Sequence, residues 1–126
     1  MSLHGTDQSK WQPNQITEGD FIICKATEGC GYVDPTCDAK YQMNKAAGKL
    51  LGVYHYARPD LGNSPEAEAE FFVNNIKGYI KEAILVLDWE SANKWDTGWA
   101  KRWLDKVKEL TGVKPVIYMS SSVTFA

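Results

Sequence analysis

The sequence predicts an α/β protein in which parallel strands alternate with helices along the chain. Two observations support this fold class. Short apolar runs, without the polar alternation of a half-exposed strand, indicate strands that are buried on both faces. Between these runs lie longer segments in which apolar residues recur every three or four positions, as they do on one face of a helix. A doubly wound sheet and part of a β/α barrel both fit this order, and 126 residues suffice for one domain.

Five strands are expected, and all but the first are apolar runs that are rich in β-branched and aromatic residues. The expected strands are Gly5–Gln8, Phe21–Thr27, Leu51–Tyr56, Ile84–Trp89 and Val116–Met119. The link between the first two strands, residues 9–20, has no clear helical period, so we expect it to be irregular.

The first of three expected helices begins at Asp34-Pro35. Asp34 can cap the helix, and Pro35 occupies a first-turn position whose N–H would have no partner within the helix. This helix is expected to bury Tyr41 and Ala47 and to end near Gly48, because glycine readily adopts the left-handed conformation that terminates helices.

The second helix is expected to begin at Ser64-Pro65, and the third to begin at Asp96-Thr97 and to end at Gly112. Both carry apolar residues at spacings of three and four, which predict one buried face for each helix. The expected buried residues are Ala69, Phe72, Val73 and Ile76 in the second helix, and Trp99, Trp103, Val107 and Leu110 in the third.

Charge and composition exclude several classes of function. Fourteen Lys and Arg residues stand against 16 Asp and Glu residues, so the net charge of −2 provides no basic field for nucleic acid or for an anionic membrane. The sequence has no apolar run near the ~18 residues of a membrane span, and no signal-peptide pattern.

Residues 1–3 resemble a vector-derived start and are left out of the fold prediction. Residues 120–126 have no cap or charged tail, which is typical of a chain that stops within its fold.

The cysteines and glycines give no indication of a cofactor or metal site. The three cysteines, Cys24, Cys30 and Cys37, form no CxxC pair, which argues against a metal cage. Cys24 lies in an apolar run and is expected to be buried, and a Cys30–Cys37 bridge is the alternative to three free thiols. No glycine-rich loop follows a strand in the form that cradles phosphate, so nucleotide chemistry has little support.

Polar and aromatic residues gather where each expected strand ends. In parallel β/α folds the carboxyl ends of the strands meet at one edge, where substrates bind, so we expect these residues to share one site. The strand ends are Asp7-Gln8, Lys25–Glu28, Tyr54–Arg58, Asp88–Glu90 and Tyr118–Ser120.

Asp88-Trp89-Glu90 is the strand end that most specifically indicates a chemistry. Alternation along a strand sends Asp88 and Glu90 to one face, with Cα atoms about 6.6 Å apart, and Trp89 to the other. Neighbouring carboxylates repel each other's charge, so one can stay protonated beside an ionised partner, as glycosidic bond cleavage requires. As a bare pattern the same spacing also occurs in solvated loops and metal-ligand pairs. Asp7, at the end of another strand, could face this pair across a groove.

Two further residues have both a structural and a functional interpretation. His55 alternates away from its tyrosine neighbours, which favours a packed, hydrogen-bonded histidine over a ligand or base. Lys25 follows an apolar run and could bind a substrate carboxylate or pair with one of the acids. The alternative for Lys25 is an ordinary ion pair with Glu28.

The strand ends resemble those of the family 25 glycoside hydrolases, the lysozymes found in many phage lysins. The matching stretches occur in the family's order and cover essentially the whole chain. They are Gly5–Ser9, Lys25–Gly29, Gly52–Arg58, Leu87–Glu90 and Val116–Tyr118, together with Glu66–Phe72, which is similar to the helix before the acidic strand.

The resemblance implies an irregular TIM-like β/α barrel that cleaves the β-1,4 bond between N-acetylmuramic acid and N-acetylglucosamine in peptidoglycan, outside the cell or at the wall. It implies that Glu90 is the general acid and that Asp88 stabilises positive charge on the sugar or orients its 2-acetamido group. Asp7 would be a further site carboxylate. The remaining implied site residues, which would line the groove, are Lys25, Tyr54, Tyr56 and Tyr118. No metal or cofactor is implied, and the partner that the resemblance implies is the glycan strand of the wall.

The sequence departs from the family after its fifth strand. The family's barrel continues through further strands, and the last active-site aspartate of the family has no counterpart here. Residues 4–126 are therefore expected to form part of a catalytic domain, with the first five parallel strands and their helices. An inactive fragment that at most binds wall glycans is the alternative function, and self-association through an uncovered sheet edge is expected.

Overall fold

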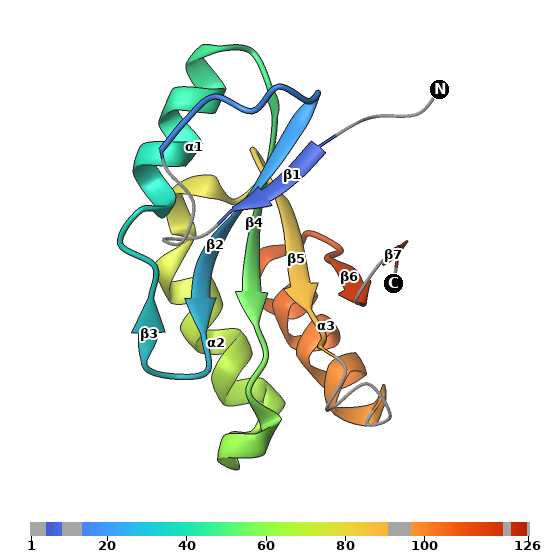
Figure 1. Cartoon of the computed structure of the whole chain (residues 1–126). Coiled ribbons are helices and arrows are strands. Elements are labelled where there is room, and N and C mark those ends of the chain that lie inside the picture. The colour runs from blue at the N-terminus through green and yellow to red at the C-terminus, as the bar shows by residue number, and fades with distance from the viewer. Residues whose placement is uncertain (1–4, 9–13, 91–96, 120–121, 126) are drawn as a thin grey trace.

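A computed structural model describes residues 5–8, 14–90, 97–119 and 122–125, and at 5–8, 119 and 122–125 it describes the backbone alone. The chain forms a mixed α/β fold in which helices cover one face of a single sheet (Figure 1). The strands are β1 (Gly5–Gln8), β2 (Phe21–Glu28), β3 (Tyr32–Val33), β4 (Leu50–Tyr56), β5 (Ile84–Asp88), β6 (Val116–Met119) and β7 (Ser122–Phe125). The helices are α1 (Cys37–Ala46), α2 (Pro65–Asn75) and α3 (Thr97–Thr111), with short 3-10 turns η1 (Pro59–Leu61) and η2 (Lys77–Tyr79).

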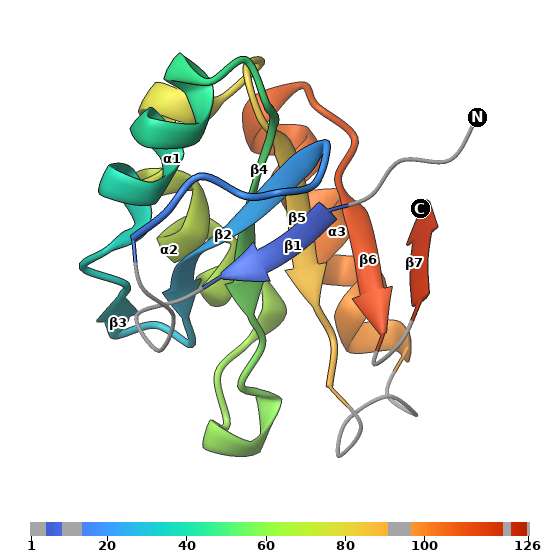
Figure 2. The same ribbon diagram turned by 45° about the horizontal axis from the view of Figure 1, so that its top comes forward.

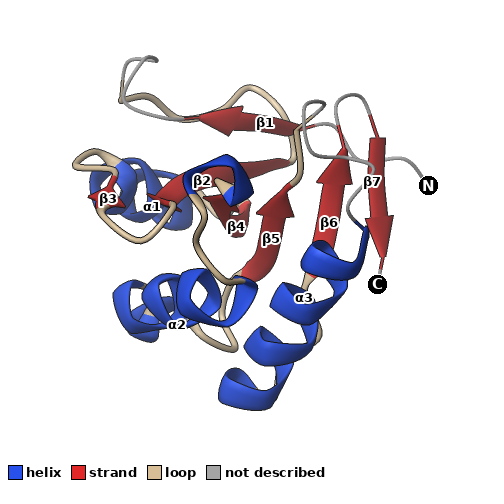
Figure 3. Cartoon of the chain, turned by 90° about the horizontal axis from the view of Figure 1, so that it is seen from below, coloured by secondary structure: helices blue, strands red, loops and turns tan. Residues whose placement is uncertain are grey.

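The strand order is β1-β2-β4-β5-β6-β7, with β3 paired to β2 outside this path. Neighbours from β1 to β6 are parallel, which confirms the five predicted parallel strands. The short strands β3 and β7 pair antiparallel with β2 and β6, and the sequence did not predict them. Figure 2 shows the strands in front of α2 and α3, and Figure 3 shows these two helices side by side below the sheet.

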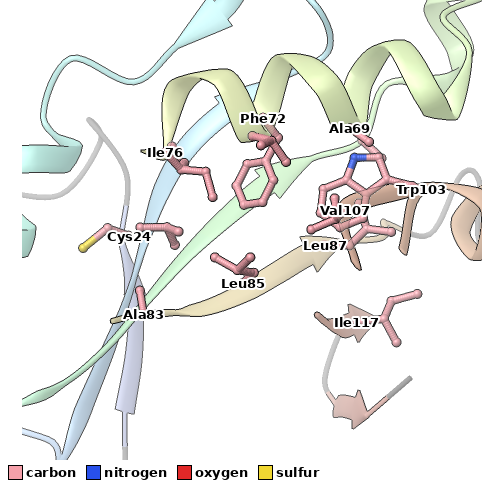
Figure 4. Close-up of a cluster of buried hydrophobic side chains, with 14 of the residues drawn as sticks. Cys24, Ala69, Phe72, Ile76, Ala83, Leu85, Leu87, Trp103, Val107 and Ile117 are labelled. Carbon is pink, nitrogen blue, oxygen red and sulfur yellow. The ribbon is translucent and has the colours of Figure 1, made fainter. Parts of the chain in front are cut away.

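The larger core lies between the sheet and the helices. Phe72 of α2 and Trp103 of α3 are fully buried, with ring centroids 5.2 Å apart, and they face Leu85 and Leu87 of β5 (Figure 4). Each such side chain stabilises the fold by about 1.5–3 kcal/mol when it leaves water. Because residues alternate along a strand, Val86 points to the opposite face of the sheet. There a smaller cluster joins Tyr54, Val86 and Val116 to the partly buried Ile23, Tyr56 and Tyr118.

The predicted starts of the helices hold for α2 but not for α1. Ser64 caps α2, since its hydroxyl accepts a hydrogen bond from the N–H of Ala67 at 3.1 Å. The prediction that Asp34 caps α1 is wrong, because Thr36 is the residue that precedes the helix. The Asp34 carboxylate accepts hydrogen bonds from both the N–H and the hydroxyl of Thr36, and this local turn delays the helix by two residues.

Most predicted buried positions are buried, and two are not. Ala47 lies just beyond the end of α1 and is exposed. Leu110 lies in the last turn of α3, where 43% of its surface stays exposed. Cys24 is buried, as predicted, and the three cysteines are free thiols rather than a Cys30–Cys37 bridge. Within the described residues, the helices are too short and too polar to cross a membrane.

Candidate active site at the carboxyl ends of the strands

The carboxyl ends of β2, β4, β5 and β6 lie next to one another in register. Asp88 of β5 pairs with Tyr56 of β4 on one side and with Tyr118 of β6 on the other. Glu28, the last residue of β2, pairs with Tyr56. Parallel strands in register present paired residues on the same face. The structure therefore brings together four strand ends that are far apart in the sequence, on the face opposite the helices.

Asp88 and Glu90 follow the predicted alternation around Trp89. Asp88 is 7% exposed and Glu90 is half-buried. Trp89 belongs to the core on the helix side of the sheet, where its ring stacks on Trp99 with a centroid distance of 5.4 Å. The N–H of Trp89 donates to the carbonyl of Tyr118 at 2.8 Å. This arrangement fixes the backbone between the two acids.

Tyr56 lies within the electric field of both acids. Burial, followed by the negative charges of Glu90 and Asp88, raises the pKa of the Tyr56 phenol above its ordinary value. The hydroxyl therefore keeps its proton at neutral pH and can donate a hydrogen bond toward the acids or a ligand. Tyr56 and Tyr118 are half-buried, whereas Tyr54 is 9% exposed and packs with Val86 and Val116.

A bulge in β2 brings Glu28 to the face that Lys25 already occupies. The register between β2 and β4 shifts between Lys25 and Thr27, so that Lys25 pairs with Tyr54 and Glu28 pairs with Tyr56. Lys25 and Glu28 form an ion pair of 2.6 Å, the alternative that the sequence left open. The Lys25 ammonium also lies 5.2 Å from the centre of the Tyr56 ring, within range of a cation–π interaction.

Arg58 extends this ion pair into a network. Its guanidinium binds the second oxygen of Glu28 at 2.7 Å and Asp60 at 2.9 Å. Burial by itself raises the pKa of Glu28, but the hydrogen bonds and charges of Lys25 and Arg58 outweigh it and lower that pKa overall. Glu28 therefore carries its charge at neutral pH and holds both cations beside the site. The sequence offered Glu28 as an ion-pair partner of Lys25 but indicated no role for Arg58, because the bulge that turns Glu28 toward both cations has no local signature.

His55 is fully buried on the helix side of β4, as predicted for a packed, hydrogen-bonded histidine. Its Nδ1 contacts the Thr27 hydroxyl at 2.7 Å, and its Nε2 contacts the Glu68 carboxylate at 2.8 Å. Burial lowers the pKa of His55 despite the opposing effect of Glu68. The imidazole is therefore neutral, donating from Nε2 to the carboxylate and accepting at Nδ1 from the hydroxyl. Glu68 was not among the predicted site residues, although an acid four residues before Phe72 on a buried helix face was a usable signal.

Asp7 is placed by its backbone alone. It lies in β1, at the register position opposite Ile23 of β2. Ile23 packs with the smaller cluster on the face of the sheet that carries Tyr56 and Tyr118.

Comparison with known proteins links this arrangement to one family. Residues 2–125 match the sequence pattern of glycosyl hydrolases family 25. The chain is 29% identical over 143 residues to the N,O-diacetylmuramidase of Chalaropsis sp, covering 96% of this chain and 67% of that protein. It spans about half the length of other curated relatives that it matches.

Two solved structures share the fold. The bacterial lysozyme from Streptomyces coelicolor superposes with a TM-score of 0.78 and 30% identity, over 91% of this chain and 61% of that one. The modular Cpl-1 endolysin, solved in complex with a peptidoglycan analogue, superposes with a TM-score of 0.71 and 25% identity, over 94% of this chain and 36% of that one.

Proposed function

Since the chain belongs to glycosyl hydrolases family 25, we propose that it hydrolyses the β-1,4 bond between N-acetylmuramic acid and N-acetylglucosamine in bacterial peptidoglycan. The observation that carries this proposal is the pair Asp88 and Glu90 at the end of β5, on the face of the sheet that also presents Tyr56 and Tyr118. The similarity to a muramidase, a lysozyme and an endolysin solved with a peptidoglycan analogue supports the same substrate.

Glu90 has the role of general acid in this proposal. It is half-buried and would protonate the oxygen of the leaving sugar. The more buried Asp88 would stabilise positive charge on the sugar ring, or orient its 2-acetamido group for attack on the anomeric carbon. Asp7 would supply the further carboxylate. These roles need no metal or cofactor.

Aromatic and basic side chains would line the glycan groove. Tyr56 and Tyr118 flank Asp88 in the register and are half-buried, so their rings and hydroxyls are available to a sugar. Lys25, held over Tyr56 by Glu28, would stand at the edge of the groove. Tyr54, deeper in the sheet, would support the floor of the groove.

The parallel order from β1 to β6, with helices on one face, supports the proposal that this sheet is part of an irregular β/α barrel. In such a barrel the face that carries the acids turns inward. We infer that the protein acts at the bacterial wall, outside the cell that it lyses or remodels.

The test is digestion of purified cell walls, with new reducing ends as the readout. The wild-type chain is expected to release reducing ends, and Glu90→Gln is expected to reduce the rate by about 10²–10⁴-fold, as loss of a general acid does. Glu109→Gln, on an exposed residue of α3, is the matched control and should act like the wild type.

The outcomes separate the two candidate functions. Circular dichroism first establishes that each variant is folded. Release that is undiminished in Glu90→Gln would contradict the assignment of the general acid. Binding of wall glycans by a folded wild-type chain, without any release, would favour the non-catalytic alternative.

A further inference from the structure

We propose that Glu68 is a positioning residue, which holds the carboxyl end of β4 so that Tyr56 and Asp88 keep their places at the site. The inference rests on the proposed function for its effect on turnover, but its structural part can be tested without activity. Glu68 lies on α2, on the opposite side of the sheet from the candidate site, and is fully buried.

The Glu68 carboxylate binds the chain on both sides of Tyr56. One oxygen accepts hydrogen bonds from the His55 Nε2 at 2.8 Å and from the Arg58 backbone N–H at 3.1 Å. His55 immediately precedes Tyr56, and Arg58 follows it by two positions. A single buried oxygen therefore fixes the ends of the segment that carries Tyr56.

The same segment holds the backbone of Asp88. The N–H of Ala57, which lies between Tyr56 and Arg58, donates to the Asp88 carbonyl at 3.3 Å. A shift of the chain at Ala57 would therefore move the strand end that carries both acids. Glu68 acts on Asp88 through this hydrogen bond, without touching it.

Glu68 is itself held from two directions. Its second oxygen accepts from the Asn63 side chain at 3.0 Å, and the Asn63 carbonyl accepts from the Trp99 indole N–H of α3 at 3.1 Å. On the other side, Thr27 of β2 fixes the His55 ring at 2.7 Å. The carboxylate thus ties α2, α3 and β2 to the end of β4. A carboxylate buried among so many donors offers more positional control than an apolar side chain in the same place.

The test compares three variants of α2. Glu68→Leu keeps the approximate size of the side chain and removes every acceptor, whereas Glu68→Gln keeps one acceptor oxygen. Val73→Ala, a buried change on the same helix that touches none of these hydrogen bonds, is the control for lost stability.

Amide hydrogen exchange is the readout that does not depend on activity. In Glu68→Leu, exchange at Ala57 and Arg58 is expected to rise at least about tenfold relative to the amides of β5, because the local restraint is lost. The turnover number on cell walls is expected to fall by about tenfold or more, since small misplacements of reacting groups are costly. Glu68→Gln should restore most of the amide protection and most of the turnover number. Val73→Ala should neither speed exchange at Ala57 and Arg58 relative to β5 nor lower the turnover number.

Two results would overturn the inference. One is exchange at Ala57 and Arg58 in Glu68→Leu that is no faster than in Val73→Ala. The other is turnover in Glu68→Leu equal to that of an active wild type. If the wild type itself shows no turnover, the proposed function fails and the exchange data alone decide the positioning role.

A measurement on the wild type keeps the inference testable if Glu68→Leu does not fold. Nitrogen NMR of His55 is expected to show a neutral ring protonated at Nε2 at neutral pH, as the hydrogen bond to Glu68 requires. A ring protonated at Nδ1 instead, or one that titrates as a free histidine does, would contradict the contact on which the inference depends.

Discussion

At the scale of single residues, Glu28 shows how a charge at the site edge is maintained. It binds Lys25 through one oxygen and Arg58 through the other, and these partners lower its pKa below the ordinary 4.5. A carboxylate with a lowered folded-state pKa stabilises the fold fully above its unfolded pKa. That stabilisation is lost as the pH falls through the lower folded-state value.

Glu28→Gln is therefore expected to lower the free energy of unfolding by about 1 kcal/mol at neutral pH, because two partly exposed ion pairs are weakened. The difference from the wild type should shrink below about pH 4.5, where the unfolded chain begins to take up the proton. Urea denaturation at pH 7 and at pH 3 measures both values. A difference that grows toward acid pH would contradict the prediction.

Tyr56 is the other residue for which the structure makes a specific prediction. Its phenol lies near Asp88 and Glu90, so Tyr56→Phe removes a donor without emptying the space. We expect the turnover number to fall by about tenfold with the fold preserved, because the site loses a hydrogen-bond donor beside the two acids. Tyr79→Phe, far from the strand ends in η2, is the control. Unchanged wall digestion by Tyr56→Phe would show that the Tyr56 hydroxyl has no part in the reaction and that the residue contributes only packing.

At the scale of elements, α2 depends on the cap at its first turn. The Ser64 hydroxyl accepts from the Ala67 N–H, and Pro65 follows in a position that needs no donor. Ser64→Ala is expected to cost about 1 kcal/mol of unfolding free energy, whereas Ser64→Asp should keep the cap and cost less. Urea denaturation of both variants provides the measurement, and equal stabilities would show that the cap contributes nothing.

The packing of β4 between its neighbours depends on Gly52. A Cβ atom at this position would lie 3.2 Å from Ile23 of β2 and 3.3 Å from the Ile84 carbonyl of β5. Gly52→Ala is therefore expected to destabilise the fold by about 1–3 kcal/mol through overpacking. Gly78→Ala is the matched control, because nothing lies within 4 Å of its added Cβ. Thermal denaturation that gives equal losses for the two variants would refute this account.

At the scale of the whole molecule, the strand order runs from β1 to β7, and among the described residues each of these two strands is paired on one side. Unpaired strand edges are templates for association with another chain. We therefore expect this chain to self-associate as its concentration rises. Light scattering over a concentration series measures this, and a monomer at the highest concentration would contradict it.

The structure also shows which features the sequence could predict. The strand β6 has the predicted bounds, and β2, β4 and β5 differ from theirs by one residue, because apolar runs bounded by turn residues are local signals. The strand β1 lies where it was expected, although it is not an apolar run. The start of α1 was misplaced because an aspartate two residues before Thr36 can cap a turn as well as a helix. The strands β3 and β7 are short edge elements, whose pairing depends on a neighbour rather than on their own composition.

The sequence by itself therefore determined the order of strands and helices, the gathering of polar residues at the strand ends, and the resemblance to one family. These follow from periodicity and from motifs a few residues long. Only the tertiary structure decided that a bulge brings Lys25 and Glu28 to one face, and that Glu68 binds the chain on both sides of Tyr56. Such contacts depend on the register between strands and on the placement of a helix over the sheet. Neither is recorded in the local pattern of any single segment.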